Sequence, residues 1–543
     1  MRRDVLFLIL GWTLIALTIP LGFCGLLTIF LDGWEMALYS FAIPALLSAF
    51  LGTLMLSLGT RTDTSERLRD REAFAAVALV WPIAVFIGAL PFWLGGMFVG
   101  PFTDGAQMID ILRGAVNSWF ESMSGFTTTG ATVISHNMSP NCIPGDMDCI
   151  NAQPRGLLIW RSLTQWFGGM GIIMLGMMIL SRVIGGGMAL ARAELTGPSL
   201  SRLRPKLKQT AFALWGLYFF LTLMEFLLLY FTGSMSLFDA FNHALTTMPS
   251  GGFSTRDASI GYYDSILVES IIIVFMFLAG VNFTLLWFIR EGDVKRAFGD
   301  EEFRNYALYV SVAFGAIFIA LVVSGNSVEK GIREGLFQVV SFATSTGYTS
   351  TNYMDESWPL FGHLILFILM VIGASAGSTS GGLKILRVTL AFKVAARELV
   401  RIAQPRKIQH IRMNGEVVEE KQIGLIIGML FVWVGLFFIS SLILSIFMSN
   451  ETFESVTMVV ASSLGNTGPT LGNFGPTATW ESMNSAALIF TSILMWFGRL
   501  ELLTAVILLH PHTWRREDKS DGEIQGLALV KRILQEKDDP ESK

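Results

Sequence analysis

The stretch SWFESMSGFTTTGATV, residues 118–133, decides how the fold of this chain is interpreted. Its first half is apolar but too short to cross a membrane, and it ends in a cluster of threonine and glycine. Three other segments have the same form: FNHALTTMPSGGFSTRD at 241–257, LFQVVSFATSTGYTS at 336–350 and VTMVVASSLGNTGPTLG at 456–472. When each segment is aligned on one glycine, the aligned residues are Gly130, Gly251, Gly347 and Gly468. Such self-similarity indicates one structural unit repeated four times.

The composition of the chain indicates a membrane protein. Of its 543 residues, 52% are hydrophobic and only 15% are charged, whereas a soluble domain of this length needs a far more charged surface. The apolar residues form runs of about 20, the length that crosses a hydrocarbon core about 30 Å thick. We expect ten such spans, near residues 4–31, 35–59, 73–98, 157–181, 209–232, 264–289, 306–324, 358–383, 422–448 and 482–510.

Basic residues distinguish the two sides of the membrane. Four loops between the spans together hold 23 lysines and arginines, and the other five hold 5. The basic loops are 60–72, 182–208, 290–304 and 384–421. Because cytoplasmic loops carry the excess of lysine and arginine, these four loops are expected in the cytoplasm. Both termini then lie in the cytoplasm, and the four glycine-containing segments lie toward the outer side.

The repeating unit is an apolar span, a short re-entrant helix, a glycine-containing loop and a second span. The predicted fold class is therefore an all-α integral membrane protein, with four pseudo-symmetric helix–pore loop–helix repeats around one central pore. We expect an N-terminal two-helix preface at 1–59 and a cytoplasmic tail at 511–543. The expected repeats occupy 60–207, 208–304, 305–421 and 422–510.

Glycine in these loops suits the binding of a dehydrated cation. Irregular backbone at membrane depth is tolerated only where protein buries it or where it lines a water-filled cavity. Carbonyl oxygens in a pore replace the water that an ion loses, and glycine adopts the required backbone angles at little cost. A single Gly, Ser and Thr cluster is more often a helix-packing surface. Four clusters in equivalent positions favour a conduction pathway for a monovalent cation.

Six motifs resemble those of the Trk/Ktr/HKT superfamily of potassium transporters, most closely its bacterial TrkH branch. They are SGFTTTGAT at 124–132, GGFSTRD at 251–257, TSTGYTS at 344–350, NTGPT at 466–470, GSTSGGLK at 377–384 and GRLELLT at 498–504. The resemblance covers nearly the whole chain. It implies K+ as the transported and filter-bound ion, with no organic cofactor in this chain. It also implies a homodimer in the bacterial inner (plasma) membrane and a cytoplasmic ring of TrkA-type nucleotide-binding regulatory subunits.

The resemblance also assigns an ion-binding selectivity filter to three residues of each repeat. These residues are Thr128, Thr129 and Gly130; Ser250, Gly251 and Gly252; Ser345, Thr346 and Gly347; and Asn466, Thr467 and Gly468. In plant relatives a serine at the first filter glycine favours sodium, so four glycines favour potassium. Pro249 and Ser250 stand where relatives more often have an aliphatic residue, which leaves room for weaker discrimination against sodium.

The eighth expected span is interrupted by GASAGSTSGG, residues 373–382. This segment suits a lipid-facing helix poorly, because each glycine costs about 1 kcal/mol of helix stability relative to alanine. The resemblance implies an intramembrane loop that blocks the pore below the filter, and a small-residue surface for close helix packing is the alternative. The gate residues that it implies are Gly373, Gly377, Ser378, Thr379, Ser380, Gly381 and Gly382, together with Arg499.

Arg499 lies within the last expected span, in MWFGRLELL. An arginine at the centre of a span costs about 2.5–3.5 kcal/mol on insertion scales, so we expect it to face protein or water. The resemblance implies that it points into the pore below the filter as a barrier to cations. The alternatives are that it lies near the inner end of the span and extends to the interface, or that it pairs with Glu501.

The three cysteines show no spacing typical of a zinc or iron–sulfur site. Cys142 and Cys149 lie in NCIPGDMDC, in the first long outer loop. The oxidising periplasm permits a disulfide there, and we expect these two residues to form one. Cys24 is expected to be a small buried hydrophobic residue.

Other functions stay open from the sequence. A potassium symporter coupled to Na+ or H+ would have coupling sites at broken helices near the middle of the membrane. An intramembrane enzyme would need a catalytic set such as paired aspartates or HExxH, which the sequence lacks, so we expect no enzymatic activity. A non-conducting sensor or scaffold would not need four repeated re-entrant loops. The basic inner loops could contact the regulatory ring or anionic membrane lipid, and nothing indicates a nucleic-acid partner.

Overall fold

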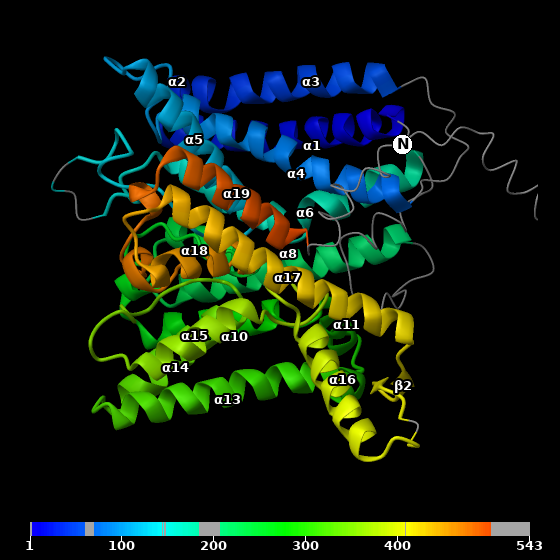
Figure 1. Ribbon diagram of the computed structural model, residues 1–543. Helices are drawn as coiled ribbons and strands as arrows, with labels where there is room; N and C mark the ends of the chain where they lie inside the picture. The colour runs from blue at the N-terminus through cyan, green and yellow to red at the C-terminus, as the bar shows by residue number, and fades with distance from the viewer. Residues whose placement is uncertain are drawn as a thin grey trace, which may run out of the picture.

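The computed structural model describes residues 3–59, 70–183 and 207–500, apart from residues 144, 146, 147 and 408. The expected tail at 511–543 and the end of the last expected span lie outside these residues. Figure 1 shows the long helices running roughly parallel, with the connecting loops at the two ends. The described chain is mostly helical, and its only strands, β1 (Arg412–Met413) and β2 (Glu416–Val417), form one short antiparallel hairpin. The predicted all-α fold class is confirmed.

Each of the ten expected spans contains helix in the structure. Six helices of the described chain are long and apolar enough to cross a membrane. They are α1 (Arg3–Leu31), the continuous unit of α2 (Trp34–Ala37), the π-helical turn η1 (Leu38–Ala42) and α3 (Ile43–Gly59), α4 (Asp70–Leu94), α8 (Leu207–Phe231), α13 (Glu301–Val323) and α17 (Glu420–Phe447). The other expected spans contain α6 (Arg155–Val183), the pair α10 (Ile266–Ala279) and α11 (Phe283–Arg290), α15 (Leu360–Val371) and α19 (Ser485–Arg499).

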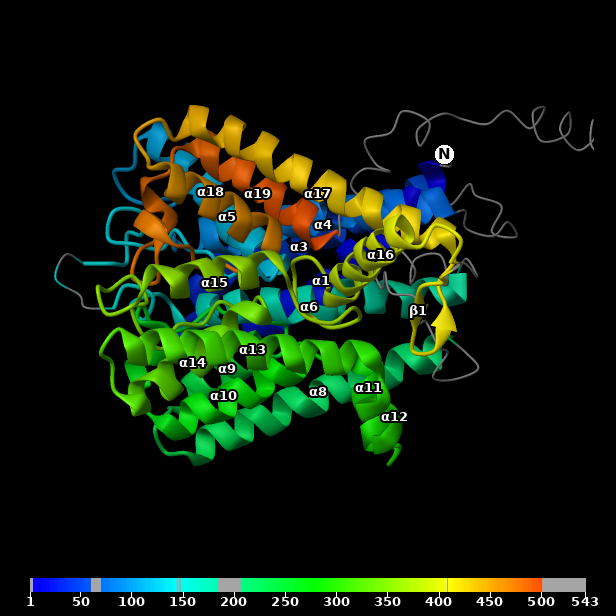
Figure 2. The ribbon, with the colours of Figure 1, turned by 60° about the horizontal axis from the view of Figure 1, so that its bottom comes forward.

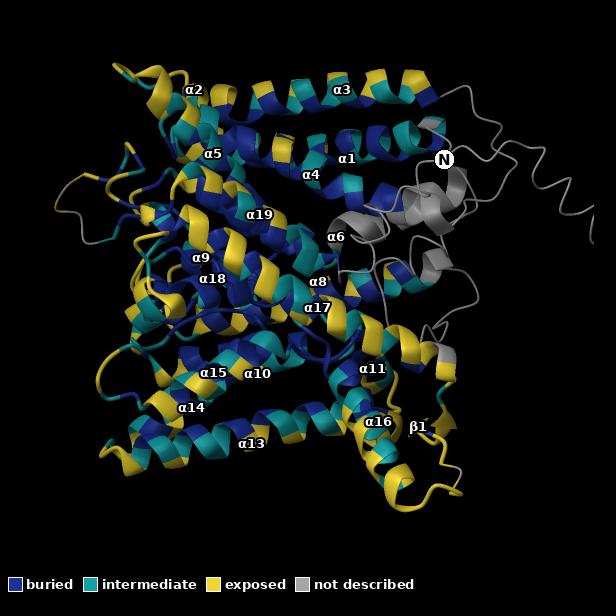
Figure 3. Cartoon of the chain, viewed as in Figure 1, coloured by how far each residue is buried: buried dark blue, intermediate teal, exposed yellow. Residues whose placement is uncertain are grey.

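Close helix contact explains why the preface contains small residues. A Cβ atom on Gly52 of α3 would lie only 3.1 Å from the carbonyl oxygen of Gly11 in α1. Nearby, the Ser48 hydroxyl donates a hydrogen bond of 2.7 Å to the Leu14 carbonyl. Small residues let two membrane helices approach each other in this way. Figure 3 shows exposed stripes along α3 and α17, which suit contact with lipid.

A short helix lies between the two spans of each repeat. These helices are α5 (Met108–Phe126), α9 (Leu237–Thr247), α14 (Val328–Ala343) and α18 (Phe453–Gly465). Figure 3 labels all four in the same half of the molecule, with buried residues toward their ends. Three begin at a hydroxyl residue that caps the helix by accepting from a backbone N–H: Ser236, Ser327 and Thr452. Such caps satisfy donors that a helix start leaves unpaired.

The sixth expected span, 264–289, is not one straight helix. Its two helices, α10 and α11, meet at an angle of 106°. The bend exchanges hydrogen bonds with the segment at 373–382: the Ser375 N–H donates to the Gly280 carbonyl, and the Phe283 N–H donates to the Gly377 carbonyl, each at 3.1 Å. The sequence did not predict this bend, because the apolar run continues through it.

Short elements complete the two ends of the molecule. At one end the 3-10 turns η2 (Ser259–Tyr263), η3 (Gly472–Phe474) and η4 (Trp480–Ser482) lie in the loops. At the other end lie α12 (Val294–Gly299) and α16 (Ile385–Ala403), and Figure 2 shows α16 beside the β hairpin. A separate small apolar cluster joins α16 to the hairpin; it includes Leu386, Leu390, Ile411 and Met413.

Candidate ion-conduction pathway

Each of the four short helices is followed by a loop with the same backbone conformation. The first residue of each loop has a φ between 52° and 57°, and a glycine two residues later has a φ between 74° and 92°. We call these segments glycine loops 1 to 4; they are residues 128–130, 250–252, 345–347 and 466–468. Glycine enters this left-handed region at little cost, whereas other residues rarely adopt it. The shared conformation therefore relates the four repeats independently of their sequences.

The backbone corrects the sequence alignment in the second repeat. Gly252, and not Gly251, has the positive φ of the glycines that end the other three loops. Gly251 instead stands where the other three loops have threonine. The alignment on Gly251 was therefore wrong by one residue. Two adjacent glycines cannot be told apart from sequence alone, because the sequence does not give backbone angles.

Backbone contacts join the four loops into a closed ring. At the end of each loop, a Cβ atom added to the glycine would collide with a carbonyl oxygen of the next loop. The four contacts run from Gly130 to Gly251, from Gly252 to Thr346, from Gly347 to Thr467 and from Gly468 to Thr129. The loops therefore surround one centre, and a side chain at any of these glycines would push two repeats apart.

Hydroxyl groups of the short helices hold the loops in place. In three repeats a serine donates to a carbonyl at or just after the glycine. These bonds run from Ser124 to Ala131 (2.6 Å), from Ser341 to Tyr348 (2.7 Å) and from Ser462 to Gly468 (2.9 Å). In repeat 2 the corresponding residue is Thr246, whose Oγ1 lies 2.5 Å from the hydroxyl oxygen of Tyr348. The loops are thus fixed from behind by short buried hydrogen bonds.

Residues 373–382, the intramembrane loop, leave the end of α15 and return beside it. At the base of this loop, the Gly373 N–H donates to the Leu383 carbonyl (2.9 Å) and the Leu383 N–H donates to the Val371 carbonyl (3.0 Å). The Ala376 N–H donates to Glu302 Oε1 at 2.6 Å. These bonds satisfy backbone groups that would otherwise be costly at membrane depth.

The tip of the intramembrane loop lies against the glycine loops. The Thr379 hydroxyl is 3.0 Å from the Ser250 hydroxyl of glycine loop 2. The Gly381 N–H donates to Ser345 Oγ of glycine loop 3 at 2.6 Å. A Cβ atom on Gly381 would collide with the carbonyl oxygen of Gly465, just before glycine loop 4. The small residues of the intramembrane loop are therefore required by close contact with three repeats.

Arg499, in the last turn of α19, joins the intramembrane loop to α6. Its Nη1 donates to the Thr379 carbonyl at 2.9 Å, and its Nη2 donates to the carbonyls of Gly168 (2.5 Å) and Gly169 (3.0 Å). The guanidinium group thus lies against protein carbonyls from repeats 1 and 3. Glu501, the alternative partner considered above, lies outside the described residues.

The sequence of this chain matches one known protein family. The sequence model of the TrkH family, described as a cation transport protein, matches residues 61–515. This chain belongs to the TrkH family. The family is one of transport proteins and not of enzymes, and the apolar helices make this TrkH-family chain a multi-pass membrane protein.

Individual relatives agree with this assignment. The Trk system potassium uptake protein TrkH of Escherichia coli K12 is 36% identical over 468 residues, covering 85% of this chain and 89% of that protein. TrkH of Halomonas elongata is 33% identical over 497 residues, covering 90% and 94%. The crystal structure of the potassium transporter TrkH from Vibrio parahaemolyticus has a TM-score of 0.79 at 30% identity, and covers 95% of this chain and 100% of that one. The resemblance expected from the motifs is confirmed.

The TrkH-family chain has further polar residues behind the ring that the sequence analysis did not identify. Arg161 and Gln165 lie one turn apart on α6, and Arg161 Nε donates to Glu121 Oε1 of α5 at 2.7 Å. One signal was available: Arg161 lies within the expected span 157–181, where an unpaired charge is costly. Glu121 and Gln165 stand in segments already rich in polar residues, so nothing in the sequence distinguishes them.

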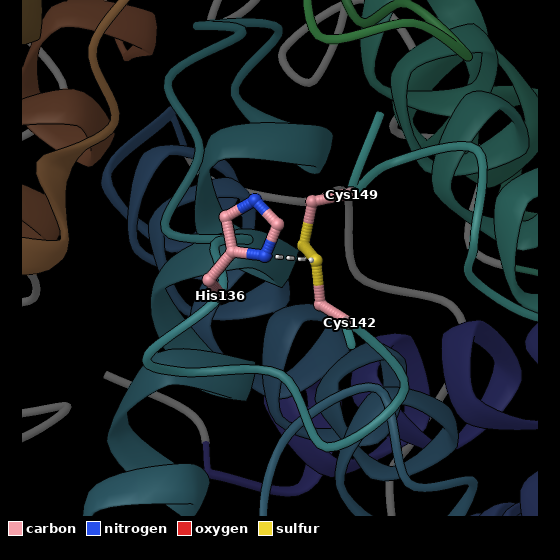
Figure 4. Close-up of side chains that lie close together, drawn as sticks. All are labelled: His136, Cys142 and Cys149. Atoms are coloured by element: carbon pink, nitrogen blue, oxygen red, sulfur yellow. Dashed lines mark hydrogen bonds between the residues drawn. A yellow bond between two sulfur atoms is a disulfide. The ribbon is translucent and has the colours of Figure 1, made fainter. Parts of the chain in front are cut away.

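Cys142 and Cys149 form a disulfide in the loop between α5 and α6. His136 lies beside it, and Figure 4 shows its Nδ1 directed at Cys142 Sγ, 3.2 Å away. In the described chain these three side chains are the one group spaced like metal ligands. Sulfur atoms joined in a disulfide offer no thiolate to a metal, which is the form that binds. This group is therefore a covalent closure of the loop and not a metal site.

The disulfide-closed loop is attached to the second repeat. The Asp257 carboxylate accepts hydrogen bonds from the backbone N–H groups of Cys149 (2.8 Å) and Ile150 (2.9 Å). Asp148 of the same loop forms an ion pair with Arg256 at 3.4 Å. Residues 256–257 follow glycine loop 2 within a few positions, so the disulfide-closed loop is attached close to the ring.

Asp239, at the start of α9, pairs with the other side of Arg256, at 3.2 Å. Partial burial would raise the pKa of this carboxyl, but hydrogen bonds from Thr255 and Ser236 and the charge of Arg256 outweigh it, so its pKa lies below the ordinary value. Asp239 therefore keeps its negative charge to lower pH than an ordinary aspartate, and this charge lies at the N-terminus of α9, where an anion stabilises a helix.

Proposed function

We propose that this chain takes up potassium ions across the bacterial inner membrane through one pore lined by glycine loops 1 to 4. The observation that carries the proposal is the closed ring of backbone contacts from Gly130 through Gly252 and Gly347 to Gly468. Such a ring offers four equivalent sets of carbonyl oxygens, which together replace the hydration shell of K+. The names of the relatives, potassium uptake proteins, favour K+ as the ion.

The three residues of each glycine loop form the selectivity filter in this proposal. Their backbone carbonyls bind the ion. The buried hydroxyls of Thr129 and Thr346 lie 2.8 and 2.7 Å from those of Thr127 and Thr344, at the ends of the short helices, and so support the loops. The short helices direct their negative C-terminal ends toward the bound cation, which adds to its stabilisation. The glycines keep neighbouring loops in contact, so that the carbonyl layers are continuous around the pore.

The intramembrane loop and Arg499 form the gate. The contacts of Thr379 and Gly381 with glycine loops 2 and 3 support a loop that closes the pore directly beneath the filter. The Arg499 guanidinium adds a positive charge beside the loop, which repels cations. Opening then requires the hydrogen bonds of the loop to Arg499 and to the filter to break together.

The assembly that we propose is the one expected from the sequence. We propose a homodimer in which each subunit has its own pore, with both termini in the cytoplasm. TrkA-type nucleotide-binding regulatory subunits bind the inner face, where α16 and the β hairpin lie, and control the gate. Membrane lipid covers the exposed apolar stripes of α13 and α17. The domain boundaries given above, including those in loops outside the described residues, remain part of this proposal.

Growth rescue tests the proposed function. The chain is expressed in a bacterium that lacks its own potassium uptake systems, on medium with micromolar to millimolar K+. We expect growth and rapid 86Rb+ uptake that excess Na+ competes with only weakly. Gly347→Asp, which places a charged side chain in the ring, is the matched inactive variant. Absence of rescue by a chain that reaches the membrane would contradict the proposal.

Purified protein in liposomes separates the proposed pore from a coupled symporter. A pore conducts down a K+ gradient alone, with no Na+ or pH gradient. Flux that requires an added Na+ or H+ gradient would favour the symporter instead. A chain that reaches the membrane but conducts in neither assay would favour the sensor or scaffold.

A further inference from the structure

Glycine loop 2 is held from behind by two side chains of α6, Gln165 and Arg161, which we call the α6 clamp. Gln165 Nε2 donates to the Gly251 carbonyl at 2.6 Å, and Gln165 Oε1 accepts from the Phe253 N–H at 3.1 Å. One turn earlier, Arg161 Nη1 donates to the Ser254 carbonyl at 3.0 Å. The Arg161 guanidinium also covers the Phe253 ring, 3.5 Å from its centroid. Gln165 therefore fixes the peptides on both sides of Gly252.

Gln165 also explains why residue 251 is a glycine. The three other loops have threonine at this position, and Gly251 does not have a positive φ that would demand glycine. A Cβ atom at residue 251 would instead collide with the Gln165 amide. The side chain that threonine supplies elsewhere in the ring is thus replaced here by an amide from α6.

The other half of the clamp connects glycine loop 2 to repeat 1. Arg161 pairs with Glu121 at 2.7 Å, and both side chains are buried, with 3% and 0% of their surface exposed. Glu121 also accepts hydrogen bonds from Thr132 Oγ1 (2.9 Å) and the Val133 N–H (3.2 Å), just after glycine loop 1. The pair is well satisfied, and removing one partner would leave a buried charge uncompensated.

The same position is filled differently in each repeat. Nine residues before the loop glycine stand Glu121, His243, Gln338 and Val459. His243 Nε2 lies 3.0 Å from Ser254 Oγ, and Gln338 Nε2 donates to Ser350 Oγ at 3.4 Å. Val459 is buried and apolar. The support behind the ring is therefore unequal, and of these four positions only that of repeat 1 holds an ion pair.

We propose that the α6 clamp sets the discrimination between K+ and Na+ by fixing the Gly251 carbonyl. This inference rests on the proposed function. Na+ is smaller than K+, so carbonyls must move toward the centre of the ring to coordinate it. The hydrogen bond from Gln165 resists this movement at one quarter of the ring, and the Arg161–Glu121 pair holds the peptides that follow. Gln165 is thus a positioning residue, which acts on the ion through Gly251.

The first test compares Gln165→Glu and Gln165→Leu with the wild-type chain. The glutamate keeps the acceptor for the Phe253 N–H but removes the donor to the Gly251 carbonyl, whereas the leucine removes both. We expect the preference for Rb+ over Na+ in competition uptake to fall by about fivefold or more in each, the ratio that corresponds to one lost hydrogen bond. Gln153→Leu is the matched control, because it removes a buried amide that bonds only in the outer loop.

The second test exchanges side-chain volume between the two positions. Gly251→Thr alone is expected to abolish uptake, because its side chain collides with Gln165. Adding Gln165→Ala makes room for it and restores the threonine pattern of the other loops, so uptake is expected to return with altered selectivity. Comparing the single Gly251→Thr variant with the double variant is informative even where Gln165→Leu fails to reach the membrane. If each substitution only damaged the structure, uptake by the double variant would be lower still and would not return.

The experiments distinguish a failure of the proposed function from a failure of the inference about the α6 clamp. A wild-type chain that takes up no Rb+ overturns the proposed function and this inference with it. A wild-type chain that prefers Rb+, together with Gln165 variants that prefer it equally, overturns the inference alone. An unrescued Gly251→Thr and Gln165→Ala double variant that is present in the membrane also counts against it.

Discussion

The Nη1 atom of Arg499 lies 2.9 Å from the carbonyl oxygen of Thr379, although the two residues are 120 positions apart in the chain. Thr379 also contacts Ser250 of glycine loop 2 through its hydroxyl. One residue of the intramembrane loop therefore connects the last described helix to the ring. A change at Arg499 should therefore affect the intramembrane loop through Thr379, and also α6 through the carbonyls of Gly168 and Gly169.

Replacing Arg499 with alanine should raise potassium flux. The change removes three hydrogen bonds from a charged donor to carbonyls of the loop and of α6, and it removes the positive charge beside the loop. Hydrogen bonds of this kind contribute about 1.5–3 kcal/mol each, so loss of one is enough for a roughly tenfold rise in 86Rb+ uptake. Uptake by Arg499→Lys, which keeps the charge, should lie between that of the wild-type chain and that of Arg499→Ala. Uptake by Arg499→Ala at or below the wild-type rate would contradict the proposed gate.

A larger side chain at Gly381 should displace the intramembrane loop. Gly381→Val collides with the Gly465 carbonyl, so the loop must move away from glycine loop 4. We expect uptake to rise, measured as 86Rb+ entry into cells. Gly428→Val is the control, because nothing lies within 4 Å of a Cβ atom at that position of α17. If the two variants transport alike, the contact at Gly381 has no role in closure.

The corrected alignment in repeat 2 can be tested with two alanine substitutions. Gly252→Ala and Gly251→Ala should both reduce uptake, but for different reasons. Gly251→Ala collides with a side chain, so Gln165→Ala should relieve it. Gly252→Ala collides with the backbone carbonyl of Thr346 and has a φ of 74°, so no change at Gln165 should rescue it. Equal rescue of both variants would show that the assignment of Gly252 to the ring is wrong.

Reducing the disulfide between Cys142 and Cys149 should lower stability but leave transport intact. The two cysteines are separated by 7 positions, and closing a loop of this size stabilises a fold by about 2.5 kcal/mol in the chain-entropy account. We expect a reductant to lower the midpoint of thermal inactivation while 86Rb+ uptake at growth temperature is unchanged. The Cys142→Ser and Cys149→Ser double variant should show the lower midpoint with or without reductant. An unchanged midpoint would mean that the ion pairs of Arg256 hold this loop by themselves.

Much of the fold could be predicted from the sequence because hydropathy and repetition report on long, regular features. The spans, the four short helices and the break near residue 373 all followed from runs of apolar or small residues. The bend between α10 and α11 did not, because its backbone groups are satisfied by a loop about 95 residues later in the chain, and local composition carries no sign of that partner.

The candidate site was predictable only in part for the same reason. The motifs identified the four loops, but choosing between Gly251 and Gly252 required backbone angles. Arg499 could be identified because a charge in an apolar span is costly. Arg161 lies in the fourth expected span and could have been identified on the same ground. Gln165 could not have been identified, because its role depends on the space beside Gly251, which exists only once α6 packs behind the ring.

The most direct test of the central claim is to locate a potassium-like ion in the protein. Crystals grown with Tl+ in place of K+ would reveal the ion by its anomalous scattering. We predict a strong peak at the centre of the ring formed by Gly130, Gly252, Gly347 and Gly468, within coordination distance of carbonyls from all four loops. Tl+ bound elsewhere, with none at the centre of the ring, would contradict the account.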